Sequence, residues 1–212
     1  MDSIGEICIS FSGTYAGAGM EELAALYDLI EKQTSQFCNE FSIACGPGCG
    51  TCCEHFMPDI TDLEARLVAA YLLLIKRDDR LIERLVEERD STTGPCPLYR
   101  ADSPYHCSVY PARPLICRLF GACANGDKQG NAIFRRCRYN LEETMPLALQ
   151  LGPDVTVMQD YSYALRGIDS SGGDGEFLPK AILAQLEQLS FLIAMIETDR
   201  SNPDDTPTPQ AS

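Results

Sequence analysis

Hydrophobic residues recur at helical spacing over several long stretches of the chain. Between Met20 and Phe41 they fall three or four residues apart, so they share one face of an α-helix. Glu21 and Glu22 stand in the first turn, where negative charge complements the helix dipole. The pattern therefore predicts a helix over residues 20–41. The members of its apolar stripe are Leu23, Leu26, Tyr27, Ile30 and Phe37.

A second helix is predicted to begin at Thr61-Asp-Leu-Glu64, which has the residues of a capping box. An apolar stripe continues behind it as far as Leu74. Further helices are predicted over residues 79–88, 141–151 and 154–168.

A long helix is also predicted near the C-terminus, where apolar residues step by four and three. This seam predicts packing either within the domain or across a homodimer. Its members are Ile182, Leu186, Leu189, Ile193 and Ile196.

These patterns predict a mainly α fold with an irregular middle. Four prolines, at positions 97, 104, 111 and 114, exclude a long helix from the first half of residues 96–140, where short helical turns or small strands are expected. The predicted organisation is a flexible N-terminus (1–19), one domain (20–199) and a disordered tail (200–212). The domain is predicted to bind metal, with a cysteine-cluster core at 44–140 and C-terminal helices at 141–199.

Composition narrows the classes of partner. The chain has 212 residues, of which 45% are hydrophobic, and a formal charge of −14. This charge argues against binding to nucleic acid or to an anionic membrane surface. Met1 to Met20 shows no secretory signal, and polar residues interrupt the apolar stretch 181–196. We therefore expect a cytoplasmic protein without a membrane partner.

Eight of the eleven cysteines form one linear pattern. Thiolates two or three residues apart can converge on one metal centre, and they are the ligands that soft metals and iron–sulfur clusters select. In a reducing cytosol a dense cysteine pattern indicates metal more often than disulfides. We therefore predict an irregular cysteine-rich lobe, pinned by metal and packed on a helical scaffold. The predicted ligands are Cys45, Cys49, Cys52, Cys53, Cys96, Cys107, Cys117 and Cys137; the other three, Cys8, Cys38 and Cys123, are predicted to be dispensable.

The spacing favours a [4Fe–4S] cluster over zinc. Structural zinc sites commonly pair two short knuckles, whereas this chain has one knuckle and four scattered cysteines. The vicinal pair Cys52–Cys53 is also hard for one tetrahedral ion to use with both sulfurs. Zinc, a second metal, and ligation by His55 or His106 remain open alternatives.

Basic residues gather around the later cysteines. Residues 96–140 carry seven basic and two acidic side chains, a net charge of +5 in an acidic chain. Arg113 and Arg118 flank Cys117, where positive charge favours a thiolate and offsets the charge of a thiolate-ligated centre.

The motifs resemble the CxxCxxCC family, the YkgJ-type zinc- or iron-chelating domains. The resemblance covers about residues 44–140 and rests on the Cys45–Cys53 knuckle, Cys96-Pro-Leu and the isolated Cys137. It also rests on Cys107-x-x-Tyr110-x-x-Arg113-Pro114-x-x-Cys117-Arg118. It implies metal binding, with Tyr110 beside the ligands together with the two arginines. The first gap here is three residues, where the family often has two. The flagellin lysine methylase carries a related cluster, which suggests that some members are enzymes.

Three classes of function remain open. The favoured one is an iron–sulfur protein with a redox or catalytic role. The second is a zinc- or iron-chelating structural or metal-handling protein. The third is a protein-modifying enzyme that depends on S-adenosylmethionine, since Cys45-x3-Cys49-x2-Cys52 has the spacing of the radical motif. The sequence names neither a reaction nor a substrate, whether a protein or a small molecule.

Overall fold

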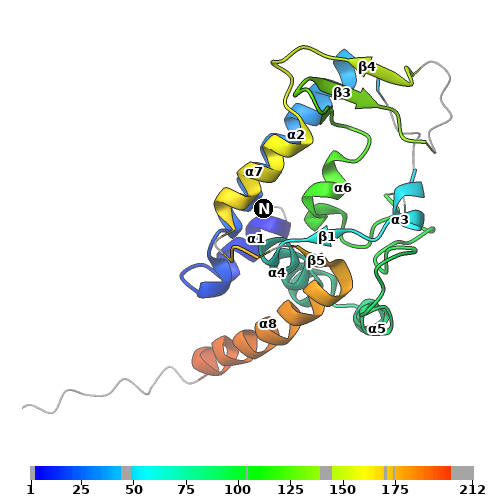
Figure 1. Cartoon of the computed structure of the whole chain (residues 1–212). Helices are drawn as coiled ribbons and strands as arrows, with labels where there is room; N and C mark the ends of the chain where they lie inside the picture. Colours follow the sequence, from blue (N-terminus) through cyan, green and yellow to red (C-terminus); the bar gives the residue numbers. More distant parts are fainter. Residues whose placement is uncertain are drawn as a thin grey trace, which may run out of the picture.

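The computed structural model describes residues 3–43, 49–103, 105–138, 145–169, 171–173 and 175–201. Its fold is mainly α, as predicted (Figure 1). The α-helices are α1 Ser3–Ser10, α2 Met20–Glu40, α3 Thr51–His55, α4 Asp62–Tyr71, α5 Asp79–Glu87, α6 Leu115–Leu119, α7 Met158–Ile168 and α8 Leu178–Ser201. Short helical segments of other types are η1 Tyr15–Gly17, η2 Leu72–Lys76 and η3 Tyr110–Ala112.

The strands are short and lie at two places. β1 (Asp59–Ile60) pairs antiparallel with β5 (Glu176–Phe177), which joins the start of α4 to the start of α8. A three-stranded antiparallel sheet has the order β2 (Asn125–Gly126), β3 (Ala132–Arg135) and β4 (Ala148–Gln150). Figure 1 shows this sheet at the far end of α2, which runs beside α7.

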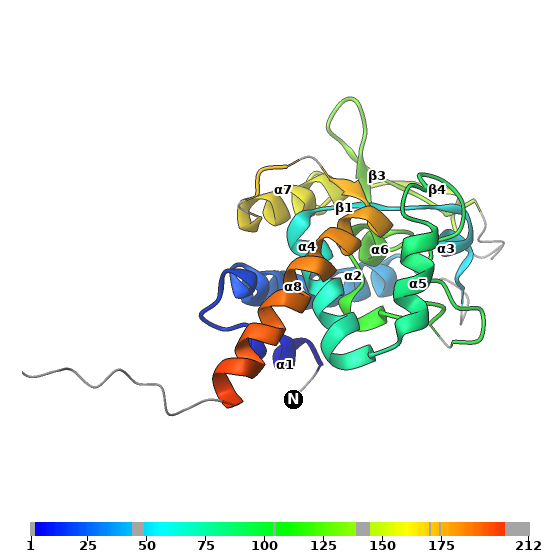
Figure 2. The same cartoon turned by 90° about the horizontal axis from the view of Figure 1, so that it is seen from below.

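The core is built around the contact between α4 and α8. Figure 2 shows α8 crossing α4, with α5 alongside. The first three residues of the predicted C-terminal seam, Ile182, Leu186 and Leu189, are buried in this core. The seam therefore packs within the domain over that part. A homodimer through α8 stays a prediction, and it would rest on the distal residues, where Phe191 and Met195 are exposed.

Helix α8 also has the length and apolar composition of a membrane span. The stretch Leu178–Ile196 meets both criteria among the described residues, and 33% of it is buried. The core helix of a water-soluble fold has the same features, and the buried face of α8 packs on α4.

The start of α4 is fixed by the predicted capping box. The amide of Glu64 donates to Thr61 Oγ1 (3.3 Å), and the amide of Thr61 donates to Glu64 Oε2 (2.9 Å). The capping box thereby satisfies the amides of Thr61 and Glu64.

Two expectations about the fold are wrong. Residues 3–10 form helix α1 in place of a flexible segment, because Ile4, Ile7 and Phe11 share a face that packs into the core. The helix expected over residues 141–151 is also wrong where it is described, since residues 148–150 form strand β4. Leu149 faces the aromatic cluster around Phe134, and β3 supplies the hydrogen-bonding edge.

Candidate metal centre

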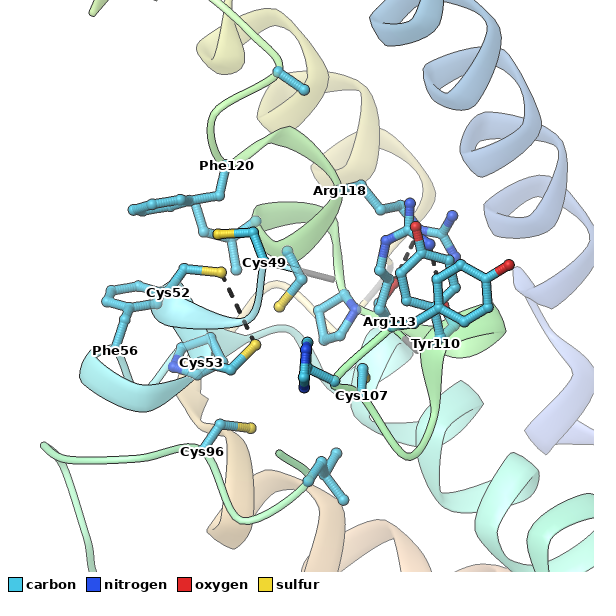
Figure 3. A pocket seen from close by; sticks show the side chains of 18 of the residues that line it. Cys49, Cys52, Cys53, Phe56, Cys96, Cys107, Tyr110, Arg113, Arg118 and Phe120 are labelled. Carbon is cyan, nitrogen blue, oxygen red and sulfur yellow. Dashed lines mark hydrogen bonds between the residues drawn. The ribbon is translucent and has the colours of Figure 1, made fainter. Parts of the chain in front are cut away.

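Six of the eight patterned cysteines line one cavity of about 500 Å³. They come from segments far apart in the sequence, yet Figure 3 shows the labelled cysteines around a common space. The stacked rings of Phe56 and Phe120 stand on one side of it, and Tyr110, Arg113 and Arg118 on the other. The six are Cys49, Cys52, Cys53, Cys96, Cys107 and Cys117. Cys45 lies outside the described residues.

Backbone hydrogen bonds hold the cysteine segments against each other. The amide of Cys96 donates to the carbonyl of Cys53 (2.7 Å), which joins α3 to the next cysteine. Tyr99 and Cys107 form an isolated antiparallel bridge, which folds the 96–107 segment back on itself. Three cysteines are therefore placed by main-chain contacts that need no metal.

Gly50 allows the close approach of these segments. A Cβ atom at this position would lie 2.6 Å from Cβ of His106 and 2.8 Å from Cε2 of Tyr99. Contacts this short do not occur between real atoms, so any larger residue would push α3 away from the 99–107 segment.

The vicinal sulfurs lie close together. Sγ of Cys52 and Sγ of Cys53 are 3.9 Å apart. Two thiolates on one tetrahedral zinc, each at about 2.3 Å, would lie about 3.8 Å apart. The two sulfurs therefore lie as far apart as one tetrahedral ion requires, although the sequence indicated that the pair could not easily serve one ion with both sulfurs. Among the described residues, however, no three Cys, His, Asp or Glu side chains meet closely enough to hold one ion.

The thiols of the cavity influence one another electrostatically. The hydrogen bond between Cys52 and Cys53 lowers the pKa of Cys52 to about 6 and raises the pKa of Cys53. Burial raises the pKa of Cys96 to about 12. Burial, then the neighbouring thiols of Cys96 and Cys107, raise the pKa of Cys117 well above its ordinary value. The thiols with raised pKa values, Cys53, Cys96 and Cys117, therefore keep their protons until a metal ion replaces them.

Arg118 is buried beneath the cavity wall. Its guanidinium lies 3.9 Å from the centre of the Tyr27 ring. Its Nε donates to the carbonyl of Arg113 (2.9 Å), and its Nη2 donates to the carbonyl of Pro111 (2.6 Å). Burial lowers its pKa. Arg118, the residue that follows Cys117, thus holds a positive charge in a fixed position beside the cavity.

Arg113 and Tyr110 form the neighbouring wall. The Arg113 guanidinium lies 3.8 Å from the centre of the Tyr110 ring, and its Nη2 donates to Glu31 Oε2 (3.1 Å). The Tyr110 ring stacks in turn on Tyr105, with 4.3 Å between ring centres. Tyr110, Arg113 and Arg118 all line the cavity, beside the predicted ligands.

Glu64 ties the helical scaffold to this wall. Its side chain is 3% exposed, and it accepts from the Tyr27 hydroxyl (3.0 Å) and from the amide of Leu115 (2.6 Å). Leu115 is the first residue of α6, the helix that carries Cys117. From the sequence, Glu64 is recognisable only as a capping residue, because nothing local shows which distant donors its carboxylate meets.

The remaining cysteines have different surroundings. Cys137 lies in a separate, smaller cavity together with His55. Cys38, predicted to be dispensable, lines the main cavity from α2. Cys8 is buried in the core, and Cys123 is buried beside a third cavity. His106 also lines the main cavity.

The cysteine-rich part of the chain matches a known family model. Residues 44–138 match the family model CxxCxxCC, described as "Putative zinc- or iron-chelating domain". These residues, somewhat less than half of the chain, are therefore similar to this family. The match includes all eight patterned cysteines and supports binding of zinc or iron as the property of this domain. No curated protein and no solved structure matches the chain significantly.

Proposed function

We propose that the CxxCxxCC domain holds a [4Fe–4S] cluster in its main cavity, with a redox or catalytic role. The observation that carries the proposal is the ring of six cysteines around a space of about 500 Å³. A structural zinc ion draws four ligands directly onto itself and leaves no such space. A cluster needs room between its four thiolates for inorganic iron and sulfide.

Four of the cavity thiols form the favoured ligand set. Cys53, Cys96, Cys107 and Cys117 come from three separate segments. The pKa of each thiol is raised, by burial for Cys96, Cys107 and Cys117 and by the hydrogen bond with Cys52 for Cys53. When bound, a four-iron cluster supplies one-electron chemistry.

The charges near the cavity favour an anionic centre. An oxidised four-iron cluster with four thiolates carries a charge of about −2 by simple counting. Arg113 and Arg118 line the same cavity, and Glu31 lies 3.1 Å and 3.7 Å from them. Two positive charges and one negative charge leave a net positive wall, which offsets part of the cluster charge.

One observation favours the second candidate, a zinc-chelating protein. The 3.9 Å separation of the vicinal sulfurs suits one tetrahedral ion. Cys52 and Cys53 would then bind zinc together with two further thiols, and the protein would have a structural or metal-handling role.

Reconstitution of cysteine variants tests the proposal. The chain is incubated anaerobically with iron and sulfide, and the visible thiolate-to-iron absorption and the iron content are measured. Cys96→Ser and Cys107→Ser are expected to lose both. Cys8→Ala is the matched control, since Cys8 is a buried cysteine outside the cavity, and it is expected to keep both. Equal iron in all three variants would overturn the proposal, and tight zinc binding without iron uptake would favour the second candidate.

A further inference from the structure

A second, smaller cavity adjoins the main one and contains metal-ligating side chains of its own. Its volume is about 290 Å³. Cys137 reaches it from beyond the end of β3, and Cys52 and His55 reach it from α3. The complete lining is Cys52, His55, Phe56, Phe120, Cys137 and Arg138.

The two members of the vicinal pair relate differently to the two cavities. Cys52 lines both cavities, whereas Cys53 lines only the main one. Successive residues on a helix point about 100° apart, so the two side chains leave α3 in different directions even though both border the main cavity. Residues three apart do share a face, which places His55 beside Cys52 on α3.

The number of donors also exceeds what one centre uses. Six of the patterned cysteines and Cys38 line the main cavity, but a tetrahedral ion or a four-iron cluster takes four thiolates. If Cys53, Cys96, Cys107 and Cys117 serve the main centre, Cys52 remains available at the boundary. Phe56 and Phe120, whose stacked rings line both cavities, form an apolar wall there.

We propose that Cys52, His55 and Cys137 bind a second metal ion, separate from the centre in the main cavity. Two thiolates and one imidazole are a donor set suited to a tetrahedral divalent ion such as Zn²⁺. With three protein ligands, the fourth position is open to water or to a small ligand. The assignment of Cys52 to this ion rests on the proposed function, because the main centre must then use the other four thiols.

Binding of a metal ion requires the side chains of Cys52, His55 and Cys137 to move toward one another. Within the described part of the chain, no three such donors are yet close enough to hold an ion. His55 is exposed and Cys137 is half-exposed, so neither side chain is part of the buried core. Arg138 lines the same cavity and offsets part of the charge of two thiolates.

Cobalt titration tests this second site. The anaerobic chain, with its iron already loaded, is titrated with Co²⁺ and followed by thiolate-to-cobalt absorption. The native chain is expected to take up one Co²⁺. His55→Ala and Cys137→Ser are each expected to weaken this binding at least about tenfold, since removing even an outer partner of a metal ligand costs that much. Both variants should keep the iron and sulfide content of the native chain.

His106→Ala is the matched control, since His106 lines only the main cavity. It is expected to bind Co²⁺ as the native chain does. Unchanged cobalt affinity in His55→Ala, which alters an exposed side chain and leaves the core intact, would overturn the second site. Failure of the proposed function would look different. The native chain would then take up no iron, whereas His55→Ala would still weaken the binding of Co²⁺.

Discussion

Replacing Glu64 with alanine should weaken the link between the helical scaffold and the helix that carries Cys117. The carboxylate accepts from three donors: the hydroxyl of Tyr27 and the amides of Leu115 and Thr61. The first two hydrogen bonds are buried, and the third is partly buried. Alanine removes the acceptor and leaves both buried donors without a partner.

The size of the expected loss of stability follows from these two buried donors. Each buried donor left unsatisfied costs about 1–3 kcal/mol, and the carboxylate no longer has to be desolvated, which offsets part of the loss. We therefore expect Glu64→Ala to lower the free energy of unfolding by about 2–4 kcal/mol. Glu64→Gln keeps an acceptor oxygen for Tyr27 and Leu115 and loses only the contact with Thr61, so about 1 kcal/mol is expected.

Urea unfolding of the metal-loaded chain, at fixed protein and metal concentrations without oxygen, measures these differences. Asp62→Ala is the matched control, since Asp62 is an exposed acid in the same first turn of α4. It should cost less than about 1 kcal/mol. A loss in Glu64→Ala no larger than that of the control would refute the anchoring role of this carboxylate.

Three further predictions follow from neighbouring contacts. Gly50→Ala should lower both metal affinity and stability, the latter by about 1–3 kcal/mol, because its Cβ would clash with His106; Gly152→Ala, which meets no atom within 4 Å, should change neither. Cys8→Ala and Cys123→Ala should keep full metal content by elemental analysis, and loss of metal in either would contradict their placement away from the main cavity. Burial raises the pKa of Glu64 above its ordinary value of 4.5, so the native state keeps this proton at a pH where the unfolded chain has lost it. The stability of the native chain relative to Glu64→Gln should therefore fall as pH rises through the window just above 4.5, and a rise in urea-unfolding experiments would show the sign to be wrong.

Local signals in the sequence predicted the helical scaffold. The apolar stripe and the acidic first turn gave α2, and the capping box gave the start of α4. The strand β4 was missed although Leu147, Leu149 and Leu151 alternate as strand residues do, because Leu141, Met145 and Ala148 are also spaced as on a helix. Helix α1 was missed because its Gly- and Ser-rich setting outweighed its apolar spacing.

The candidate site could be predicted only as a set of residues. Cysteine spacing identified the donors, but their division between two cavities depends on which face of α3 each side chain occupies and on contacts more than forty residues apart. The approach of Cys38 to the main cavity and the contacts of Glu64 with Tyr27 and Leu115 likewise arise from helix packing. No periodicity within one segment carries that information.

Iron and acid-labile sulfide analysis of the full chain, purified without oxygen, tests the central claim most directly. The account predicts about four irons and about four sulfides per chain, with a paramagnetic resonance signal after one-electron reduction. Zinc as the main metal, with no labile sulfide, would contradict it.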